Sequence, residues 1–294
     1  QIPRPEFNHG GGLVLLAMKW TANLQPVTPI FRRLSPLDMR PPYRNGLNNR
    51  DRERKVGKWV TGIMGFYCIS MFLVPLLMPT GSVPELSGRA NGFDYATENS
   101  WGNMEHPDGG AMGHNQSAHG GTFAWSELNP YFAFIYAFGD LNCHQKHERS
   151  WTINGNQMPV CARDVGIFFG LALGGWWFSR KGLNRWTMRD SFLTLFPDDI
   201  IAPLYTKDRR LMAMFTIGVL FCLPVVLDGG IQAISAYESV NPLRLATGIP
   251  FGFIIGWYLC ASISSKPIDF RLDPTRVHLP KGARLAPLES SEEE

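Results

Sequence analysis

Apolar residues gather in blocks along this chain, and charged residues lie between the blocks. Four blocks are long enough to cross a bilayer, because about 20 apolar residues in a helix span its hydrocarbon core. They run over 57–78, 162–178, 211–227 and 243–263. A shorter apolar stretch, 128–138, favours a re-entrant or interfacial helix. The pattern predicts an all-α integral membrane protein, a four-transmembrane-helix bundle with a long extracytoplasmic loop between the first two helices.

The intervals between the blocks predict the orientation. Lys and Arg concentrate before the first block, between the second and third, and after the fourth, and an excess of Lys and Arg marks cytoplasmic segments. We therefore expect a multi-pass protein of the inner (cytoplasmic) membrane with both termini in the cytoplasm. The intervals are a basic arm over 1–56, an extracytoplasmic His/Gly-rich loop over 79–161, a cytoplasmic loop over 179–210, an extracytoplasmic loop over 228–242 and a cytoplasmic tail over 264–294.

Two of the blocks carry glycines at a spacing of four residues. Small residues at this spacing line one face of a helix and let two backbones approach closely in lipid. The spacing predicts a packed pair of helices, or faces for self-association and for other membrane subunits. The glycines are Gly166, Gly170 and Gly174 in the second block, and Gly248, Gly252 and Gly256 in the fourth.

Composition narrows the class of function. The net charge of +3 over 294 residues is small, and no basic patch interleaves with aromatic residues, so a nucleic-acid partner is not expected. Membrane lipids are the expected partners. The chain also lacks a nucleophile elbow, a phosphate loop, a dinucleotide fingerprint and an HExxH motif. Whether the protein is an enzyme stays open.

Polar residues from three intervals are brought by this topology to the outer end of the bundle. Charges at such depth are costly unless paired, and they mark a functional site by default. The alternative is a salt-bridge lattice that fixes helix register. Asp228 and Arg244 can pair across the short loop, and the neighbouring charges can join them. The cluster comprises Cys143, His144, His147, Glu148, Arg149, Cys161, Arg163, Asp164, Asp228, Gln232 and Arg244.

The same residues carry a family resemblance over roughly residues 130–262. The ordered motifs are Cys143-His144-Gln145, Glu148-Arg149-Ser150, Met158-Pro159-Val160-Cys161-Ala162-Arg163 with Gly166, Leu223-Pro224, Asp228-Gly229, Gln232, Asn241, Leu243-Arg244 and Thr247-Gly248. The chain resembles the prokaryotic membrane family catalogued as domain of unknown function 2085. The resemblance implies a fold and a membrane location, and no activity is established for the family. Family members often have a second cysteine at the position of Asp164. Because this chain has Asp there, a four-ligand zinc site of the CxxC knuckle type is less expected.

Two accounts of Cys143 and Cys161 remain open. They can form a disulfide, as exported proteins use cysteines, or they can bind Zn or Cu together with His144, with His147 or Asp164 as a fourth donor. The other cysteines, Cys68, Cys222 and Cys260, lie inside apolar blocks as small fillers. The stretch 104–119 adds Met104, His106, Met112, His114 and His119, either as a flexible loop without metal or as a copper-capturing one.

Three hypotheses for the function follow. The first is a non-catalytic accessory or scaffolding subunit of a membrane complex, which the long basic arm favours. The alternative is a membrane-embedded enzyme or a Zn/Cu-handling protein that acts at the extracytoplasmic face through the polar cluster, where a neighbouring His and Glu suit proton transfer. A transporter is disfavoured, because the apolar blocks hold no ionisable residue at mid-depth.

Overall fold

The fold is given by a computed structural model that describes residues 50–88, 92–105 and 116–285. Most of the predicted basic arm, together with His106, Met112 and His114, lies outside the described residues. The described part is mostly helical, and its strands are one short antiparallel pair. The prediction of an all-α protein is confirmed at this level.

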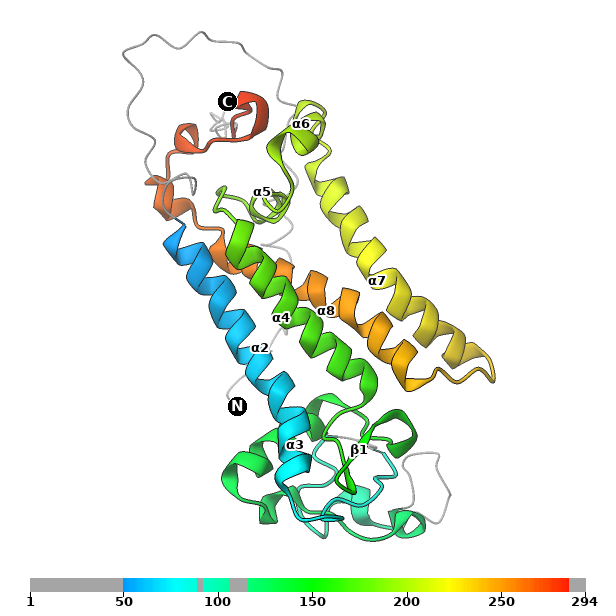
Figure 1. The fold of residues 1–294 in the computed structure, drawn as a ribbon. Helices are drawn as coiled ribbons and strands as arrows, with labels where there is room; N and C mark the ends of the chain where they lie inside the picture. Colours follow the sequence, from blue (N-terminus) through cyan, green and yellow to red (C-terminus); the bar gives the residue numbers. More distant parts are fainter. Residues whose placement is uncertain (1–49, 89–91, 106–115, 286–294) are drawn as a thin grey trace, which may run out of the picture.

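Four long helices form the body of the molecule: α2 (Asp51–Leu77), α4 (Ala162–Lys181), α7 (Arg210–Ile234) and α8 (Asn241–Ser264) (Figure 1). Among the described residues, α2, α7 and α8 are long and apolar enough to cross a membrane. Helix α4 does not reach that level, because it has several glycines and carries charged residues in its first and last turns. The fourth span therefore stays a prediction.

The predicted packing of the two glycine-containing segments is confirmed. The glycines of each helix lie against backbone carbonyls of the other: Gly166 on Leu245, Gly170 on Ile249, Gly174 on Phe253, Gly248 on Arg163, Gly252 on Ile167 and Gly256 on Leu171. Because these numbers rise together, α4 and α8 run parallel, with their first turns at the same end. The glycine faces are filled by this contact within the chain. Association with other subunits or with a second copy stays a prediction.

Helices α2 and α7 cover other sides of this pair. Helix α2 runs antiparallel to α4, with Gly57 close to Ser179 and with the Thr61 hydroxyl donating to the carbonyl of Ala172 at 3.2 Å. Helix α7 packs on α8, where the rings of Phe221 and Phe253 stack at 5.5 Å. Large apolar side chains elsewhere on α2 and α7 are exposed, as expected of surfaces that face lipid.

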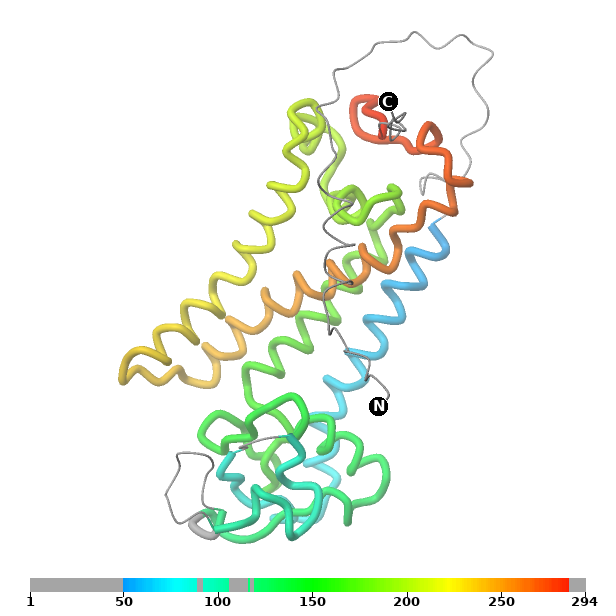
Figure 2. Tube along the Cα trace, turned by 180° about the vertical axis from the view of Figure 1, so that it is seen from behind, coloured from blue at the N-terminus to red at the C-terminus, as the bar shows by residue number. Residues whose placement is uncertain are grey.

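A cap of residues 78–88, 92–105 and 116–161 lies beyond one end of the helices (Figures 1 and 2). It contains η2 (Trp101–Asn103), η3 (Gln116–His119), η4 (Trp125–Glu127), α3 (Pro130–Asn142), η5 (His147–Arg149), β1 (Thr152–Ile153) and β2 (Asn156–Gln157). The apolar stretch 128–138 falls mainly in α3, which begins with Pro130 and is capped by the Asn129 side chain. Tyr131 of α3 donates to the Ser70 hydroxyl of α2 at 2.7 Å, so α3 packs against that helix.

Short helices cover the opposite end. They are α5 (Met188–Leu193), α6 (Asp198–Thr206), η6 (Pro267–Phe270), η7 (Pro274–Arg276) and η8 (Pro280–Gly282). Trp257 of α8 stacks on Phe192 of α5 at 4.1 Å and donates its indole N–H to the Phe192 carbonyl at 2.9 Å. The interval 179–210 thus contains two helices that pack on the end of the bundle.

Candidate functional site

The first turns of α4 and α8 lie side by side at the end of the helices that is next to the cap. The N-cap residues are Cys161 and Val240, and neither side chain bonds the first-turn N–H groups. The first N–H groups of a helix have no partner within the helix, and they form the positive end of its dipole. Two such ends meet here because the helices are parallel.

Arg163 forms an ion pair with Asp228 near the end of α7. The hydroxyl of Tyr237 also donates to Asp228, at 3.4 Å. The proposed pairing of Asp228 with Arg244 is wrong, since Arg163 reaches the same turn of α7 and a Cβ at Gly229 would lie 3.9 Å from its Nη1. The ion pair ties α4 to α7 at this end.

Arg149 joins the cap to the loop between α7 and α8. Its Nη2 lies 3.0 Å from Oε1 of Glu238, and Gln232 donates to the same oxygen at 3.3 Å. The hydrogen bond from Arg149 lowers the pKa of Glu238. In addition, the Asn241 side chain at the start of α8 donates to the carbonyl of Ser150 at 3.1 Å.

Arg244 differs from the other two arginines of this end. Its side chain is buried, with 2% of the residue exposed. Its Nη1 makes one long bond, 3.4 Å, to the Asn241 side chain, while Nε and Nη2 have no partner among the described residues. Those residues also place no carboxylate within salt-bridge distance of it. A buried guanidinium that is not compensated is costly, so it calls for an explanation.

The described cysteines are free thiols, and the predicted disulfide between Cys143 and Cys161 is not formed. The sulfur of Cys143 accepts the backbone N–H groups of Gln145 and Cys161, at 3.4 and 3.1 Å. The Cys161 thiol instead donates a hydrogen bond to the Asp164 carboxylate at 3.2 Å.

The predicted metal site of Cys143, His144 and Cys161 is not supported. Donor atoms of Cys143, Cys161 and Asp164 do lie within 4.8 Å of one another, but exposed His144 is not among them. The hydrogen bond with the Cys161 thiol and burial raise the pKa of Cys143 well above its usual value.

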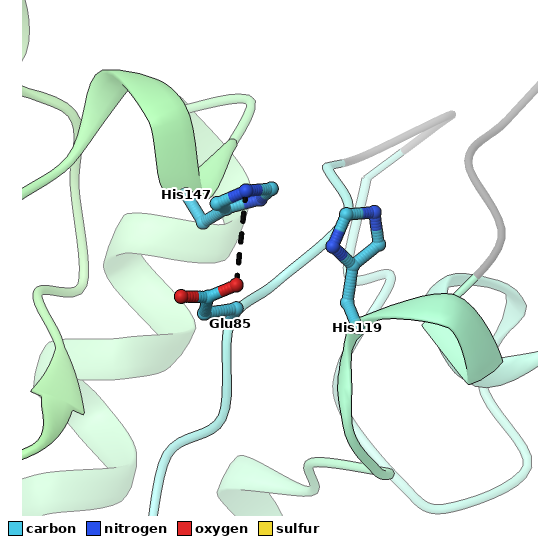
Figure 3. A group of neighbouring side chains, drawn as sticks. All are labelled: Glu85, His119 and His147. Atoms are coloured by element: carbon cyan, nitrogen blue, oxygen red, sulfur yellow. Dashed lines mark ion pairs between the residues drawn. The ribbon is translucent and has the colours of Figure 1, made fainter.

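His147 and Glu148 lie apart from the arginines, in a second group within the cap. His147 faces Glu85 and His119 (Figure 3), and its Nδ1 is 3.8 Å from a carboxylate oxygen of Glu148. The sequence did not single out Glu85, because an isolated acid in a long loop carries no motif.

Comparison with known proteins shows which of these residues lie within a known family region. Residues 143–258 match the family described as predicted membrane protein (DUF2085), so Glu85 and His119 lie outside the matched region. An uncharacterized protein of Methanocaldococcus jannaschii is 30% identical over 151 residues, which cover 45% of this chain and 79% of that protein. An uncharacterized protein of Methanothermobacter thermautotrophicus is 33% identical over 111 residues, which cover 37% of this chain and 77% of that protein. No solved structure matches the chain. The chain thus belongs to the DUF2085 family of predicted membrane proteins, as the motifs from Cys143 to Gly248 indicated.

Proposed function

We propose that this membrane protein binds a phosphate group between the first turns of α4 and α8. The observation that carries the proposal is the buried guanidinium of Arg244, whose Nε and Nη2 have no partner among the described residues. These two nitrogens form one edge of the guanidinium, the edge that donates to both oxygens of a phosphate or carboxylate. An anion on this edge would satisfy both donors.

The surroundings of Arg244 favour an anion. Arg149 and Arg163 are near enough to act on it electrostatically, and the first-turn N–H groups of two helices add positive potential. The carboxylates of Asp228 and Glu238 are engaged by Arg163 and Arg149. The phosphate is either the headgroup of a lipid or a soluble compound, and both sources are compatible with a site at the end of a bundle.

The accessory or scaffolding role is the second candidate, and the structure gives it less support. The glycine faces of α4 and α8, which this role would use to bind partners, are filled within the chain. The enzyme and metal-handling alternative keeps Cys143, Cys161 and Asp164 close together, but His144 drops out of the predicted ligand set.

We also propose that the protein lies in the inner membrane with both termini in the cytoplasm and the cap outside. Arg180, Lys181 and Arg189 support this orientation, because they lie at the end opposite the cap.

Binding can be tested on the full chain in dodecyl maltoside, which has no phosphate. Inorganic phosphate or phosphatidylglycerol is added, and the thermal midpoint is followed, together with native mass spectrometry to count retained lipid. A ligand at 100 times its Kd stabilises the protein by about 2.7 kcal/mol. A response to inorganic phosphate identifies a soluble ligand, and a response to phosphatidylglycerol alone identifies a lipid headgroup.

The informative variant is Arg244→Gln, with Arg54→Gln as the control. Arg54 is an exposed arginine in the first turn of α2, at the end away from the cap. We expect Arg244→Gln to weaken binding at least tenfold and Arg54→Gln to leave it unchanged. The proposal fails if neither phosphate source shifts the midpoint of the wild-type protein, or if Arg244→Gln binds as tightly as the wild type.

Orientation is tested separately in intact cells with a membrane-impermeant maleimide. Ser126 in the cap and Lys281 near the C-terminus are both exposed. We expect Ser126→Cys to be labelled above the background of the wild-type cysteines, and Lys281→Cys not to be. The reverse result would invert the proposed topology.

A further inference from the structure

Three side chains of the cap converge from separate segments (Figure 3). Glu85 lies in the segment that follows α2, His119 ends η3 and His147 begins η5. One ligand atom of each lies within 4.8 Å of the others. Nε2 of His147 is 3.8 Å from Oε2 of Glu85, and the centroids of the His119 and His147 rings are 4.6 Å apart. From this convergence we propose that Glu85, His119 and His147 bind a divalent metal ion of the zinc type.

The donor set and the spacing suit such an ion. Zinc takes imidazole nitrogens and carboxylate oxygens at about 2.0–2.2 Å, so two ligand atoms of a tetrahedral site are about 3.3 Å apart. The His147 to Glu85 distance of 3.8 Å is close to that value. The remaining ligand atoms, within 4.8 Å, need movements that side-chain rotation can supply. Two histidines and one carboxylate leave the fourth position of the ion open.

A buried atom without a hydrogen bond points to the same ligand. Nδ1 of His147 is buried and has no hydrogen-bond partner among the described residues, and a Glu148 carboxylate oxygen lies 3.8 Å away. A metal on Nε2 places the ring proton on Nδ1, where Glu148 can accept it after a small shift. Histidines that bind metals usually donate their other N–H to such a carboxylate, which orients the ring and raises its basicity.

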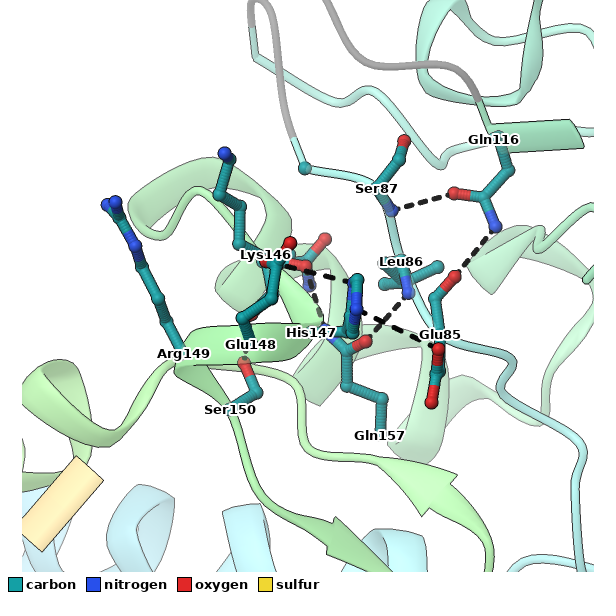
Figure 4. Close-up of polar contacts among 12 residues, drawn as sticks. Glu85, Leu86, Ser87, Gln116, Lys146, His147, Glu148, Arg149, Ser150 and Gln157 are labelled. Atoms are coloured by element: carbon teal, nitrogen blue, oxygen red, sulfur yellow. Dashed lines mark hydrogen bonds and ion pairs between the residues drawn. The ribbon is translucent and has the colours of Figure 1, made fainter. Parts of the chain in front are cut away.

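Gln116 holds Glu85 next to the helix that carries His119 (Figure 4). Gln116 is buried, with 1% of the residue exposed. Its Oε1 accepts the N–H of Ser87 at 2.9 Å, and its Nε2 donates to the carbonyl of Glu85 at 2.9 Å. Gln116 and His119 are the ends of the same short helix, η3. The backbones of two ligands are therefore fixed to each other.

The third ligand is tied to the same segment. The N–H of His147 donates to the carbonyl of Leu86 at 3.0 Å, and the N–H of Leu86 donates to the buried Gln157 side chain at 2.7 Å (Figure 4). The segment of Glu85 is thus held by two sets of hydrogen bonds. One set joins it to the helix of His119 through the Gln116 side chain, and the other joins it to the backbone of His147. Ligands held in place before the ion arrives bind it more tightly, because less ordering is needed. The bound ion would fasten three parts of the cap together.

The test uses the full chain in dodecyl maltoside, freed of metal with a chelator and then titrated with Zn²⁺ alone. Competition with a chromophoric chelator gives the affinity, and elemental analysis gives the stoichiometry. We expect about one zinc per chain in the wild type. His119→Asn and Glu85→Gln, at half-exposed and exposed positions, should each weaken binding at least tenfold. Glu148→Gln should weaken it about 10- to 100-fold, as loss of a carboxylate behind a histidine ligand does.

Two exposed residues serve as controls, Glu127 in the cap and His278 at the opposite end. Glu127→Gln and His278→Asn should bind zinc as the wild type does. Binding that is equal in the wild type, His119→Asn and Glu85→Gln overturns the proposal, as does an equal loss in the controls. The site shares no residue with the arginines around the proposed phosphate. Zinc affinity and the phosphate response of Arg244→Gln therefore fail or succeed separately.

Discussion

Replacement of Gly252 by alanine should weaken the contact between α4 and α8. A Cβ at Gly252 would collide with the carbonyl oxygen of Ile167, and it would lie 2.7 Å from the carbonyl carbon and 2.8 Å from the Cα of that residue. Cβ atoms essentially never approach within 3.0 Å of a non-bonded heavy atom from another part of the chain. The obstacle is backbone, which has no rotamer to change, so the two helices must move apart.

The size of the effect follows from two costs and one opposing gain. Overpacking of a well-packed contact costs about 1–3 kcal/mol. A radial gap of about 0.5–1 Å also loses a quarter to a half of the dispersion energy of each separated atom pair. Alanine gains up to about 1 kcal/mol over glycine as a helix former. We expect a net loss near 2 kcal/mol, which is about a 30-fold change in the ratio of folded to unfolded protein.

Gly65→Ala is the matched control, because a Cβ at Gly65 of α2 meets nothing within 4 Å. The measurement is reversible unfolding by sodium dodecyl sulfate in mixed micelles, followed by tryptophan fluorescence. Gly252→Ala should shift the transition to lower detergent fraction, while Gly65→Ala should leave it unchanged or shift it upward. Equal stability of Gly252→Ala and the wild type would refute the close contact, and an equal loss in Gly65→Ala would show that glycine matters for another reason.

Three further predictions concern the cap and its cysteines. Gln157→Leu removes two hydrogen bonds of 2.7 Å, one to the N–H of Leu86 and one to the carbonyl of Gln145. Loss of both should lower the free energy of unfolding by about 2–6 kcal/mol and speed proteolysis of the cap. Unchanged proteolysis would contradict this. Burial raises the pKa of Asp140, so its share of stability is present below about pH 4 and is lost as the pH rises through the raised pKa. Asp140→Asn should therefore gain on the wild type in thermal midpoint between pH 4 and 8, and a constant difference would be the contrary result. Cys143, 1% exposed and with a raised pKa, should react with maleimide more slowly than half-buried Cys161, and both should react after denaturation without reductant; labelling that requires reductant would show a disulfide.

Periodicity and glycine spacing carried most of what the sequence could say about the fold. The apolar blocks located the long helices, and the four-residue glycine spacing located the contact between α4 and α8. Helix ends were less accessible. Helix α2 begins at Asp51, among charged residues, where Arg52 pairs with Asp269 from the far end of the chain. Helix α7 continues through Asp228 to Ile234 because Arg163 compensates that carboxylate. Both extensions depend on distant partners that local sequence does not name.

The candidate sites divide in the same way. The sequence pointed to Arg163, Asp228 and Arg244 because charges next to apolar blocks are unusual. It could not show that Arg163 reaches Asp228 and that Arg244 has no carboxylate partner in the described part of the chain, since that depends on which helices are parallel. Glu85 was missed altogether. Its neighbours in space come from η3 and η5, and the buried Gln116 side chain that joins them has no sequence signature.

The parallel contact between α4 and α8 also orders the biosynthesis of the protein. Helix α4 is made first, and its glycine face stays open while α5, α6 and α7 follow, because α8 is the element that fills it. By its own composition α4 falls short of the apolar level that α2, α7 and α8 reach. A nascent chain that ends before α8 therefore exposes a groove of bare backbone along α4. In the full chain the backbone of α8 fills that face.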